Sequence, residues 1–199
     1  MREVLAFAAA FLLGSVPSAY LWVRAKTGKD IRTMGSGNVG ATNVFRSIGR
    51  ADGIAVLALD AAKGIAGVWI GGALLPTMAD PQLLGFALGC AAILGHVFTP
   101  WLGFKGGKGV ATGAGVAFAV YPAPFLLALV VWAATLKVSR YMSVASILAA
   151  YVFAGAVFWL VPGKIHAPIT LLAAVFITWT HRANIARLRQ GTEPKLFHK

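Results

Sequence analysis

Charged residues, and acidic ones above all, are scarce in this chain of 199 residues. Only 12% of the residues are charged, and six aspartates and glutamates stand against 18 lysines and arginines. Because soluble domains carry about 25% charged residues, the composition excludes an ordinary soluble domain. So few carboxylates also leave little material for a metal cage or a carboxylate general base. We therefore expect neither a metal ion nor any other cofactor.

Cysteine and the common catalytic sets are missing as well. Cys90 is the only cysteine, which excludes an intramolecular disulfide and a cysteine-ligated metal cluster. No Ser–His–Asp or Cys–His set is evident. The His-x-x-x-x-Asp signature of acyl-CoA-dependent glycerolipid acyltransferases is absent, since Trp101 stands five residues after His96 and Ala186 five after His181. The aspartate-rich pattern of CDP-alcohol phosphotransferases is absent too.

What the chain has in abundance is apolar sequence: 58% of its residues are hydrophobic and its mean hydropathy is +0.76. A membrane-spanning helix needs about 20 such residues. The first run does not resemble a cleaved signal peptide, because its start, Met-Arg-Glu, carries no net positive charge and no Ala-x-Ala site follows. The candidate spans are Val4–Val23, Ile54–Leu75, Leu83–Pro100, Val110–Leu136, Ser143–Val161 and Pro168–Thr180.

The run Val110–Leu136, which Tyr-Pro-Ala-Pro interrupts at residues 121–124, would suit either one kinked span or two short ones. With two spans, all the basic residues except Arg2, Lys63 and Lys164 fall inside a single group of loops, as the positive-inside rule requires. The sequence therefore predicts an all-α membrane protein, a seven-transmembrane-helix bundle forming a single domain over residues 1–199. Its N-terminus lies outside and its C-terminus is cytoplasmic. The net charge of +12 then reflects membrane topology, and we expect no nucleic-acid partner.

Four polar, glycine-rich segments fall on the cytoplasmic face of this topology. Small residues let a backbone approach a ligand closely, and hydroxyl, amide, lysine and guanidinium groups donate hydrogen bonds to phosphate. Four loops of this chemistry on one side indicate a phosphate-binding site. The segments are 35–46, 95–112, 139–143 and 181–193.

Two of these segments resemble nucleotide-binding motifs, but one lacks the structural context of its motif and the other lacks the residue pattern. Gly35–Gly40 fits G-x-G-x-x-G, but a dinucleotide fingerprint follows a buried strand, and Lys29-Asp-Ile-Arg-Thr-Met precedes this one. No G-x-x-x-x-G-K-[ST] pattern can be laid over Lys105-Gly-Gly-Lys108. We predict neither a Rossmann site nor a Walker site here.

Within the four segments the polar residues have alternative roles. The small polar residues of the first segment would also suit helix caps or turns, but an arginine beside them favours a ligand site; they are Ser36, Asn38, Thr42 and Asn43, with Arg46. Lys105 and Lys108 would serve as anion ligands or as ordinary cytoplasmic anchors. His96 is a candidate catalytic residue or a buried structural histidine.

Helical spacing links residues at two further places. His181, Asn184 and Arg187 are three apart, so on one helix they would share a face leading out of the membrane. Asp60 and Lys63 have the same spacing inside a span. Ionisable groups there are candidates for function, although an ion pair that braces the bundle is an equal alternative.

Six motifs follow one another along the chain: Gly14-Ser-Val-Pro17, Gly35-Ser-Gly-Asn-Val-Gly-Ala-Thr-Asn43 with Arg46, Asp60-Ala-Ala-Lys-Gly64, Gly95-His96, Phe104-Lys-Gly-Gly-Lys-Gly-Val-Ala-Thr112, and His181-Arg-Ala-Asn-Ile-Ala-Arg-Leu-x-x-Gly-x-Glu193. In these motifs the chain resembles the bacterial acyl-phosphate:glycerol-3-phosphate acyltransferases, the PlsY family. The resemblance covers essentially the whole chain and keeps the family's order of motifs. One departure is Thr99-Pro-Trp101, where Phe-Pro-Val or similar is expected.

This resemblance implies a seven-helix enzyme of the bacterial inner membrane with its site toward the cytoplasm. Such enzymes move an acyl chain from acyl phosphate to the 1-hydroxyl of glycerol 3-phosphate, giving lysophosphatidic acid and phosphate. The partners implied are the two substrates and the lipid bilayer. By motif match the acceptor's phosphate is held by Ser36, Arg46, Lys105, His181 and Asn184, with Ser143 and Arg187 nearby. The pocket or the donor site is completed by Asn38, Thr42, Asn43, His96, Lys108 and Thr112.

Two questions stay open at this stage. The proton of the attacking hydroxyl would go to a substrate phosphate oxygen, or to His96 or His181 acting as general base. A small anion transporter would also gather cations near helix ends, but transporters bind near the bilayer midplane and often show inverted repeats. The polar segments here share one face, and no internal repeat is evident.

Overall fold

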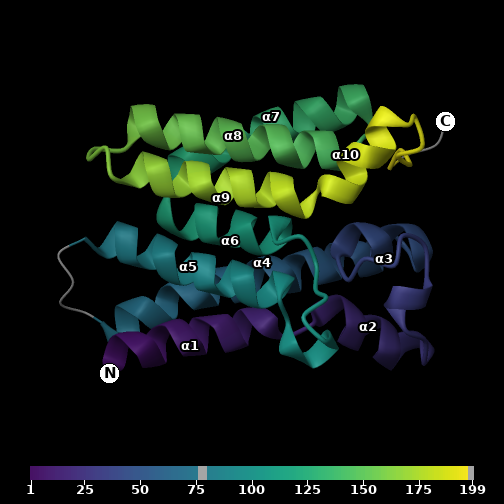
Figure 1. Cartoon of the computed structure of the whole chain (residues 1–199), viewed down its shortest axis with the longest axis horizontal. Coiled ribbons are helices and arrows are strands. Elements are labelled where there is room, and N and C mark those ends of the chain that lie inside the picture. The colour runs from purple at the N-terminus through teal and green to yellow at the C-terminus, as the bar shows by residue number, and fades with distance from the viewer. Residues whose placement is uncertain (76–79, 197–199) are drawn as a thin grey trace. The chain divides into compact units, whose positions relative to one another are not determined.

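The computed structural model describes residues 1–75 and 80–196 (the backbone alone at 71 and 72), and all regular structure in this part of the chain is helical. The chain forms two compact units, Met1–Val120 and Tyr121–Lys199. The first contains α1 (Arg2–Ser15), α2 (Ser18–Thr27), the 3₁₀ turn η1 (Ile31–Thr33), α3 (Ala41–Ser47), α4 (Arg50–Leu74), α5 (Pro81–Val97), the 3₁₀ turn η2 (Pro100–Leu102) and α6 (Val110–Val120) (Figure 1).

Two pairs of helices pack closely in the first unit: α1 lies against α5, and α4 against α6. The second pair meets backbone to backbone at Gly64, where a Cβ would overlap the carbonyl oxygen of Thr112. Such contact through small residues is how helices associate in a membrane, where apolar surface alone gives no preference for a neighbouring helix over lipid. The close approach fixes the start of α6 against α4.

The helical run of the first apolar stretch breaks at Val16–Pro17, as expected for a proline that cannot donate a backbone hydrogen bond. Two side chains from elsewhere in the unit bind the carbonyls at this break. Thr99 Oγ1 donates to the Ser15 oxygen at 2.6 Å, and Lys63 Nζ donates to the Val16 oxygen at 2.9 Å. Carbonyl groups within a membrane need such partners because no bulk water reaches them.

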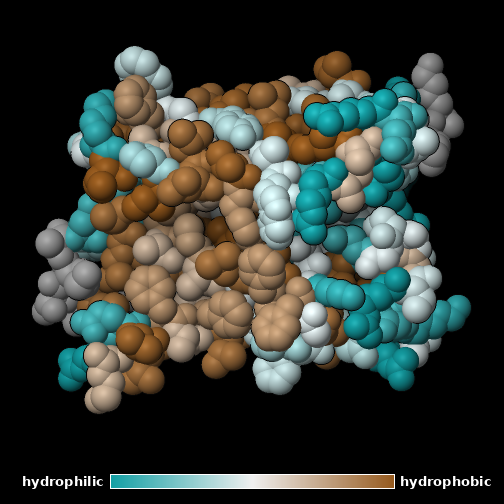
Figure 2. Space-filling view, viewed as in Figure 1, coloured by the Kyte–Doolittle hydropathy of each residue, from teal (hydrophilic) through white to brown (hydrophobic). Residues whose placement is uncertain are grey.

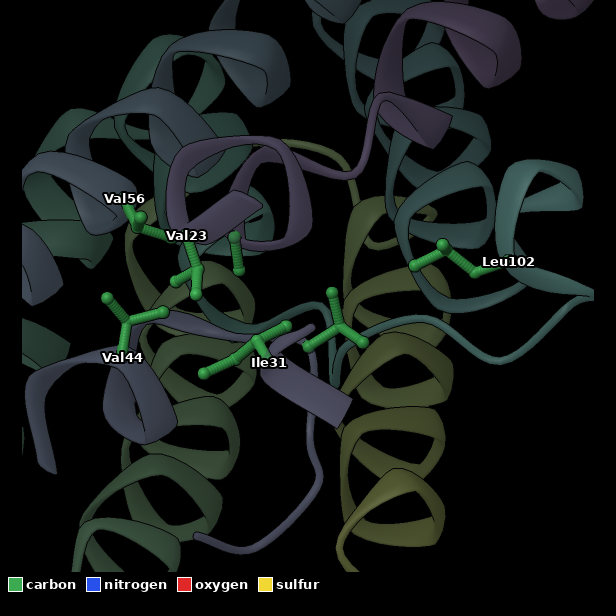
Figure 3. Packing of buried hydrophobic residues seen from close by; sticks show 7 residues of the cluster. Val23, Ile31, Val44, Val56 and Leu102 are labelled. Atoms are coloured by element: carbon green, nitrogen blue, oxygen red, sulfur yellow. The ribbon is translucent and has the colours of Figure 1, made fainter. Parts of the chain in front are cut away.

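A buried apolar cluster holds the turn after α2 against the rest of the unit. Val23 of α2, Ile31 of η1, Val44 of α3 and Val56 of α4 point toward one another (Figure 3) and are all fully buried. Ala19, Val39 and Leu102 complete the cluster. These contacts join the segment between α2 and α3 to the helices on either side of it.

The second unit consists of α7 (Pro122–Ser139), α8 (Met142–Leu160), α9 (His166–Thr180) and α10 (Arg182–Arg189). Helix α8 packs against both α7 and α9. The break expected within 110–136 lies at Tyr121, between α6 and α7, where Pro122 begins the new helix. The Tyr121 hydroxyl lies 2.7 Å from Nδ1 of His166, which joins the start of α7 to the start of α9.

Five helical stretches are long and apolar enough to cross a membrane: Arg2–Thr27, Arg50–Ile70, Pro81–Leu102, Pro122–Ser139 and Met142–Leu160. Helices α6 and α9 are apolar but shorter. In the first unit hydrophilic residues gather over α2 and α3, and in the second they gather over α10 (Figure 2). Each unit therefore has a polar end adjoining an apolar length of helix, as a membrane protein requires.

Candidate functional site

Asn43 organises the first polar segment. It lies in α3, and its side chain is 3% exposed. Its Nδ2 donates to the carbonyls of Met34 and Asn38, both at 3.0 Å, and to that of Ile31 at 3.3 Å. Its Oδ1 accepts the N–H of Ser36 at 3.0 Å. The amide that the sequence predicts as a ligand thus shapes the loop that carries the other candidates.

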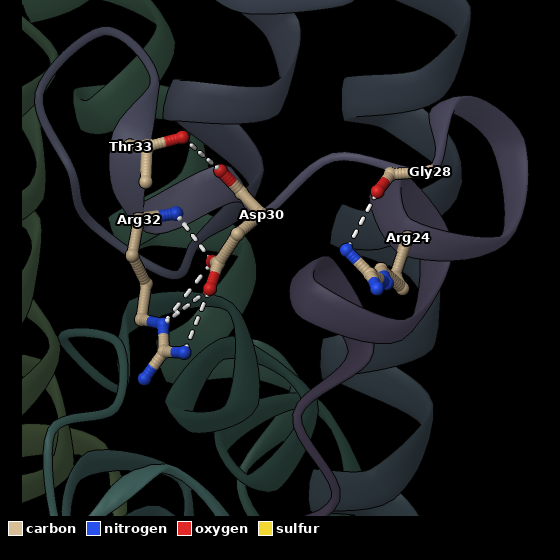
Figure 4. A network of polar contacts seen from close by, with 5 residues as sticks. All are labelled: Arg24, Gly28, Asp30, Arg32 and Thr33. Carbon is tan, nitrogen blue, oxygen red and sulfur yellow. Dashed lines mark hydrogen bonds and ion pairs between the residues drawn. The ribbon is translucent and has the colours of Figure 1, made fainter.

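The turn that leads into this segment is fixed by its own charged side chains (Figure 4). Arg24 donates to the Gly28 carbonyl at 2.6 Å, and Gly28 ends α2 in the left-handed region at φ 71°. Asp30 caps η1 by accepting the Arg32 N–H at 2.9 Å, and it pairs with the Arg32 guanidinium at 2.7 Å. Hydrogen bonds from Arg32 hold the pKa of Asp30 below its ordinary value. The charge of Arg32 is therefore largely neutralised by its neighbour.

The remaining candidates of this segment lie around the loop that Asn43 holds. Ser36 is exposed at the turn, whereas Asn38, Thr42 and Arg46 are half-buried. Thr42 and Arg46 both project from α3, one turn apart. The seven residues Ala41–Ser47 form a helix in a segment that the glycine content alone would suggest is a loop.

A second loop, residues 103–109, folds back over the carboxyl end of α5. We call it the lysine loop because it carries Lys105 and Lys108. The N–H of Gly106 donates to the Val97 carbonyl at 2.9 Å, and that of Gly107 to the His96 carbonyl at 3.2 Å. These bonds satisfy carbonyls that the end of a helix leaves without partners. Both amides thus serve α5, and the loop also carries two cationic side chains, the exposed Lys105 and the half-buried Lys108.

The two loops meet at Gly107. A Cβ there would lie 2.8 Å from the Val39 carbonyl oxygen and would overlap Nε2 of His96. The close approach therefore requires glycine and brings segment 35–46 beside the lysine loop. Thr112, two residues into α6, is fully buried, and its hydroxyl has no hydrogen-bond partner among the described residues.

The departure at Thr99-Pro-Trp101 has a local explanation. Thr99 Oγ1 binds the Ser15 carbonyl, and Trp101 Nε1 donates to the Ser15 hydroxyl at 2.8 Å. Both residues thus join η2 to the end of α1, just before the lysine loop begins. At this departure the two side chains therefore anchor the segment that leads into the loop.

In the second unit three of the predicted ligands converge on Glu193, a residue that the sequence analysis assigned no role. Its Oε1 accepts from Asn184 Nδ2 at 2.6 Å and from Ser143 Oγ at 2.9 Å. Its Oε2 accepts from Arg187 Nε at 2.8 Å. Burial opposes ionisation, but these hydrogen bonds outweigh it and lower the pKa of Glu193. The sequence feature that could have indicated this role is the position of Glu193 at the end of a motif rich in hydrogen-bond donors.

His181 lies at the junction between α9 and α10, so the predicted helix face of His181, Asn184 and Arg187 begins at a helix boundary. Its ring is 2% exposed, and Nδ1 lies 2.8 Å from the Ile177 carbonyl. Because a carbonyl oxygen only accepts, Nδ1 carries the proton in this contact. Asn184 and Arg187 follow on α10, and both reach Glu193.

A family model described as glycerol-3-phosphate acyltransferase matches residues 4–191. The chain belongs to the glycerol-3-phosphate acyltransferase family. Curated relatives with that name include a protein of Desulforamulus reducens, 44% identical over 199 residues, with 100% of this chain and 98% of the relative covered. Another, from Geobacter sulfurreducens, is 45% identical over 193 residues and covers 97% of each chain.

Solved structures agree with this membership of the acyltransferase family. A crystal structure of PlsY (YgiH), an integral membrane glycerol 3-phosphate acyltransferase in its glycerol 3-phosphate form, superposes with a TM-score of 0.90. It is 35% identical, and the match covers 100% of this chain and 96% of that one. The lysophosphatidic acid form gives a TM-score of 0.86 at 34% identity, covering 98% and 95%. The chain is an integral membrane acyltransferase, and the transporter alternative is set aside.

Proposed function

We propose that this acyltransferase uses acyl phosphate as donor and forms 1-acyl-glycerol 3-phosphate, or lysophosphatidic acid, with release of phosphate. Its family membership supports glycerol 3-phosphate as the acceptor. The choice of donor rests on the motif match over the whole chain and on the absence of the His-x-x-x-x-Asp signature that acyl-CoA-dependent enzymes use. The similar structure in a lysophosphatidic acid form supports the product.

The topology that we propose has seven spans and one domain over residues 1–199, in the bacterial inner membrane. The five long apolar helices account for five spans, and the shorter α6 and α9 supply the other two. The distribution of lysine and arginine supports an N-terminus outside and a C-terminus in the cytoplasm. The polar loops then face the cytoplasm, where glycerol 3-phosphate is dissolved.

We propose substrate ligands in both units, and each set is described within its own unit. From the first unit, side chains around the Asn43-held loop and the lysine loop bind the two phosphates: Ser36, Asn38, Thr42, Arg46, Lys105, Lys108 and Thr112. From the second unit, His181 and Asn184 act on the acceptor, and Ser143 and Arg187 adjoin them. The single observation that carries this assignment is the contact at Gly107, which sets segment 35–46 beside the lysine loop.

The chemistry follows from the charge of these groups. The C1 hydroxyl oxygen of glycerol 3-phosphate attacks the acyl carbon, and the bond from that carbon to the phosphate oxygen breaks. Phosphate leaves with the electron pair, and one of its oxygens takes the hydroxyl proton. Lysine and arginine screen the repulsion between two anionic substrates, so alignment and electrostatic stabilisation supply most of the catalysis. His96 or His181 as general base is the alternative.

A donor comparison tests the proposed function. Purified full-length enzyme in liposomes is given radiolabelled glycerol 3-phosphate with acyl phosphate, acyl-CoA or acyl carrier protein as donor. We expect labelled lysophosphatidic acid with acyl phosphate alone. Formation of product from acyl-CoA or acyl carrier protein, with none from acyl phosphate, would overturn the proposed donor.

Substitution of Arg46 tests the ligand assignment. We expect Arg46→Met to lower kcat/KM about 100-fold, as loss of one preorganised anion ligand does. Arg50→Met, which removes an exposed arginine four residues later, is the matched control and should keep normal activity.

Two histidine variants test which group accepts the proton of the attacking hydroxyl. His181→Gln with normal kcat and a raised KM would exclude His181 as base. Large losses of kcat in both His96→Gln and His181→Gln would contradict transfer to the substrate phosphate.

A further inference from the structure

Three ionisable side chains lie together inside the first unit, within apolar helices. Asp60 and Lys63 belong to α4 and His96 to the end of α5, with exposed fractions of 2%, 7% and 7%. Asp60 Oδ1 lies 2.9 Å from Lys63 Nζ and 3.6 Å from His96 Nδ1. Ionisable groups in a membrane span are costly and are retained for pairing or for function.

The position of Lys63 has a structural explanation. Its ammonium group donates to the Val16 carbonyl at the break before Pro17, while Asp60 neutralises its charge. An ion pair that braces α4 against the first helix accounts for these two residues. It does not account for His96, whose Nδ1 faces the same carboxylate oxygen from α5.

The imidazole of His96 connects that carboxylate to the lysine loop. Nδ1 faces Asp60, while Nε2 lies against Gly107, so closely that a Cβ on Gly107 would overlap it. The backbone of His96 also accepts the Gly107 N–H, and a Cβ on Gly106 would overlap the same carbonyl. The position of the ring therefore determines where the loop can lie.

We propose that Asp60 is a positioning residue for substrate binding. Its carboxylate, acting through the His96 ring, places the lysine loop, which carries Lys105 and Lys108. The 3.6 Å separation is longer than a hydrogen bond, so the hold is electrostatic and depends on the charge of Asp60. The inference rests on the proposed role of the two lysines as ligands of anionic substrates. It assigns the buried acid a part in affinity as well as in bracing the helices.

The test measures the dissociation constant of radiolabelled glycerol 3-phosphate and the thermal unfolding midpoint, using full-length protein in detergent. The variants are Asp60→Asn, His96→Gln, the pair Asp60→Asn/His96→Gln and the charge-neutral pair Asp60→Asn/Lys63→Met. The last variant removes both members of the ion pair, so no buried charge is left alone. It should fold even where Asp60→Asn by itself does not.

We expect Asp60→Asn/Lys63→Met to unfold at a higher midpoint than Asp60→Asn, though below wild type because the Val16 carbonyl loses its Lys63 donor. Its dissociation constant should stay raised about tenfold, as for loss of one charge-assisted contact. Adding Asp60→Asn to His96→Gln should not raise the dissociation constant further, because each change alone already removes the contact between the carboxylate and the imidazole ring. Recovery of both stability and affinity in the charge-neutral pair would show a purely structural ion pair and overturn the inference. The inference would also be overturned if the dissociation constant of the pair Asp60→Asn/His96→Gln rose by the product of the two single fold-changes.

This readout is independent of the acyl donor. If the wild type makes lysophosphatidic acid only from acyl-CoA, the proposed donor is wrong, but the comparison of dissociation constants still decides the role of Asp60. Conversely, normal use of acyl phosphate with wild-type affinity in the charge-neutral pair would leave the proposed function standing and remove the inference.

Discussion

Replacing Glu193, the one acidic residue in the sequence of the second unit, should destabilise that unit strongly. Alanine removes the acceptor of Ser143, Asn184 and Arg187 at once. Ser143 and Asn184 are 2% and 6% exposed, so two buried donors lose their partner, at about 1–3 kcal/mol each. The Arg187 side chain is 35% exposed, so its ion pair adds at most about 1 kcal/mol. We expect Glu193→Ala to lower the free energy of unfolding by about 3–5 kcal/mol.

Glu193→Gln separates charge from shape. Its amide oxygen would still accept from Ser143 and Asn184, but its NH₂ group would face Arg187 Nε, also a donor. The loss should therefore be about 1–2 kcal/mol, intermediate between wild type and alanine. Glu3→Ala is the matched control: Glu3 is 61% exposed and pairs with the N-terminal ammonium, so its removal should change stability by less than about 0.5 kcal/mol.

The assay is unfolding of the full chain in mixed detergent micelles with increasing dodecyl sulfate, repeated at several pH values. The lowered pKa of Glu193 means that its contribution is complete above the unfolded pKa of about 4.3. It is lost as the pH falls through the lower folded pKa. The gap between wild type and Glu193→Ala should thus shrink below about pH 4. A gap under about 0.5 kcal/mol at pH 7, or one that stays constant on acidification, would refute this reasoning.

Three further substitutions test the packing around the site. Asn43→Asp turns an oxygen toward three carbonyls and should cost about 3 kcal/mol and raise KM for glycerol 3-phosphate; an unchanged KM would contradict the loop-holding role. Gly64→Ala should cost about 1–3 kcal/mol because its Cβ overlaps the Thr112 carbonyl, whereas Gly113→Ala, at ordinary contact distance, should not lower the unfolding midpoint. Gly155→Ala, which meets open space on α8, should gain up to about 1 kcal/mol by the same unfolding assay.

Features that depend on local chemistry could be predicted from the sequence. The breaks at Pro17 and before Pro122 follow from proline itself, and the long apolar helices follow from composition. The choice of two helices over 110–136 came from charge, and the structure confirms the break at Tyr121. The family followed from the order of the motifs.

What the sequence could not provide are contacts that form only when separate segments fold against one another. Nothing local shows that Asn43 binds three backbone carbonyls, because that contact depends on how the loop folds around its side chain. Likewise the sequence does not show that the amides of Gly106 and Gly107 bind the carbonyls at the end of α5. Nothing in the sequence pairs Glu193 with Ser143, which lies 50 residues away, and its contacts with Asn184 and Arg187 depend on how the chain turns back after α10.

The charged pair in α4 also bears on how the chain enters the bilayer during synthesis. Asp60 and Lys63 lie near the middle of the apolar stretch Arg50–Ile70, where each charge costs about 2.5–3.5 kcal/mol on insertion. Their spacing lets each neutralise the other before α5 has been made. The Val16 carbonyl, which Lys63 binds, belongs to a segment already synthesised. The break after the first helix therefore provides a polar partner for Lys63 when α4 packs against it in the membrane.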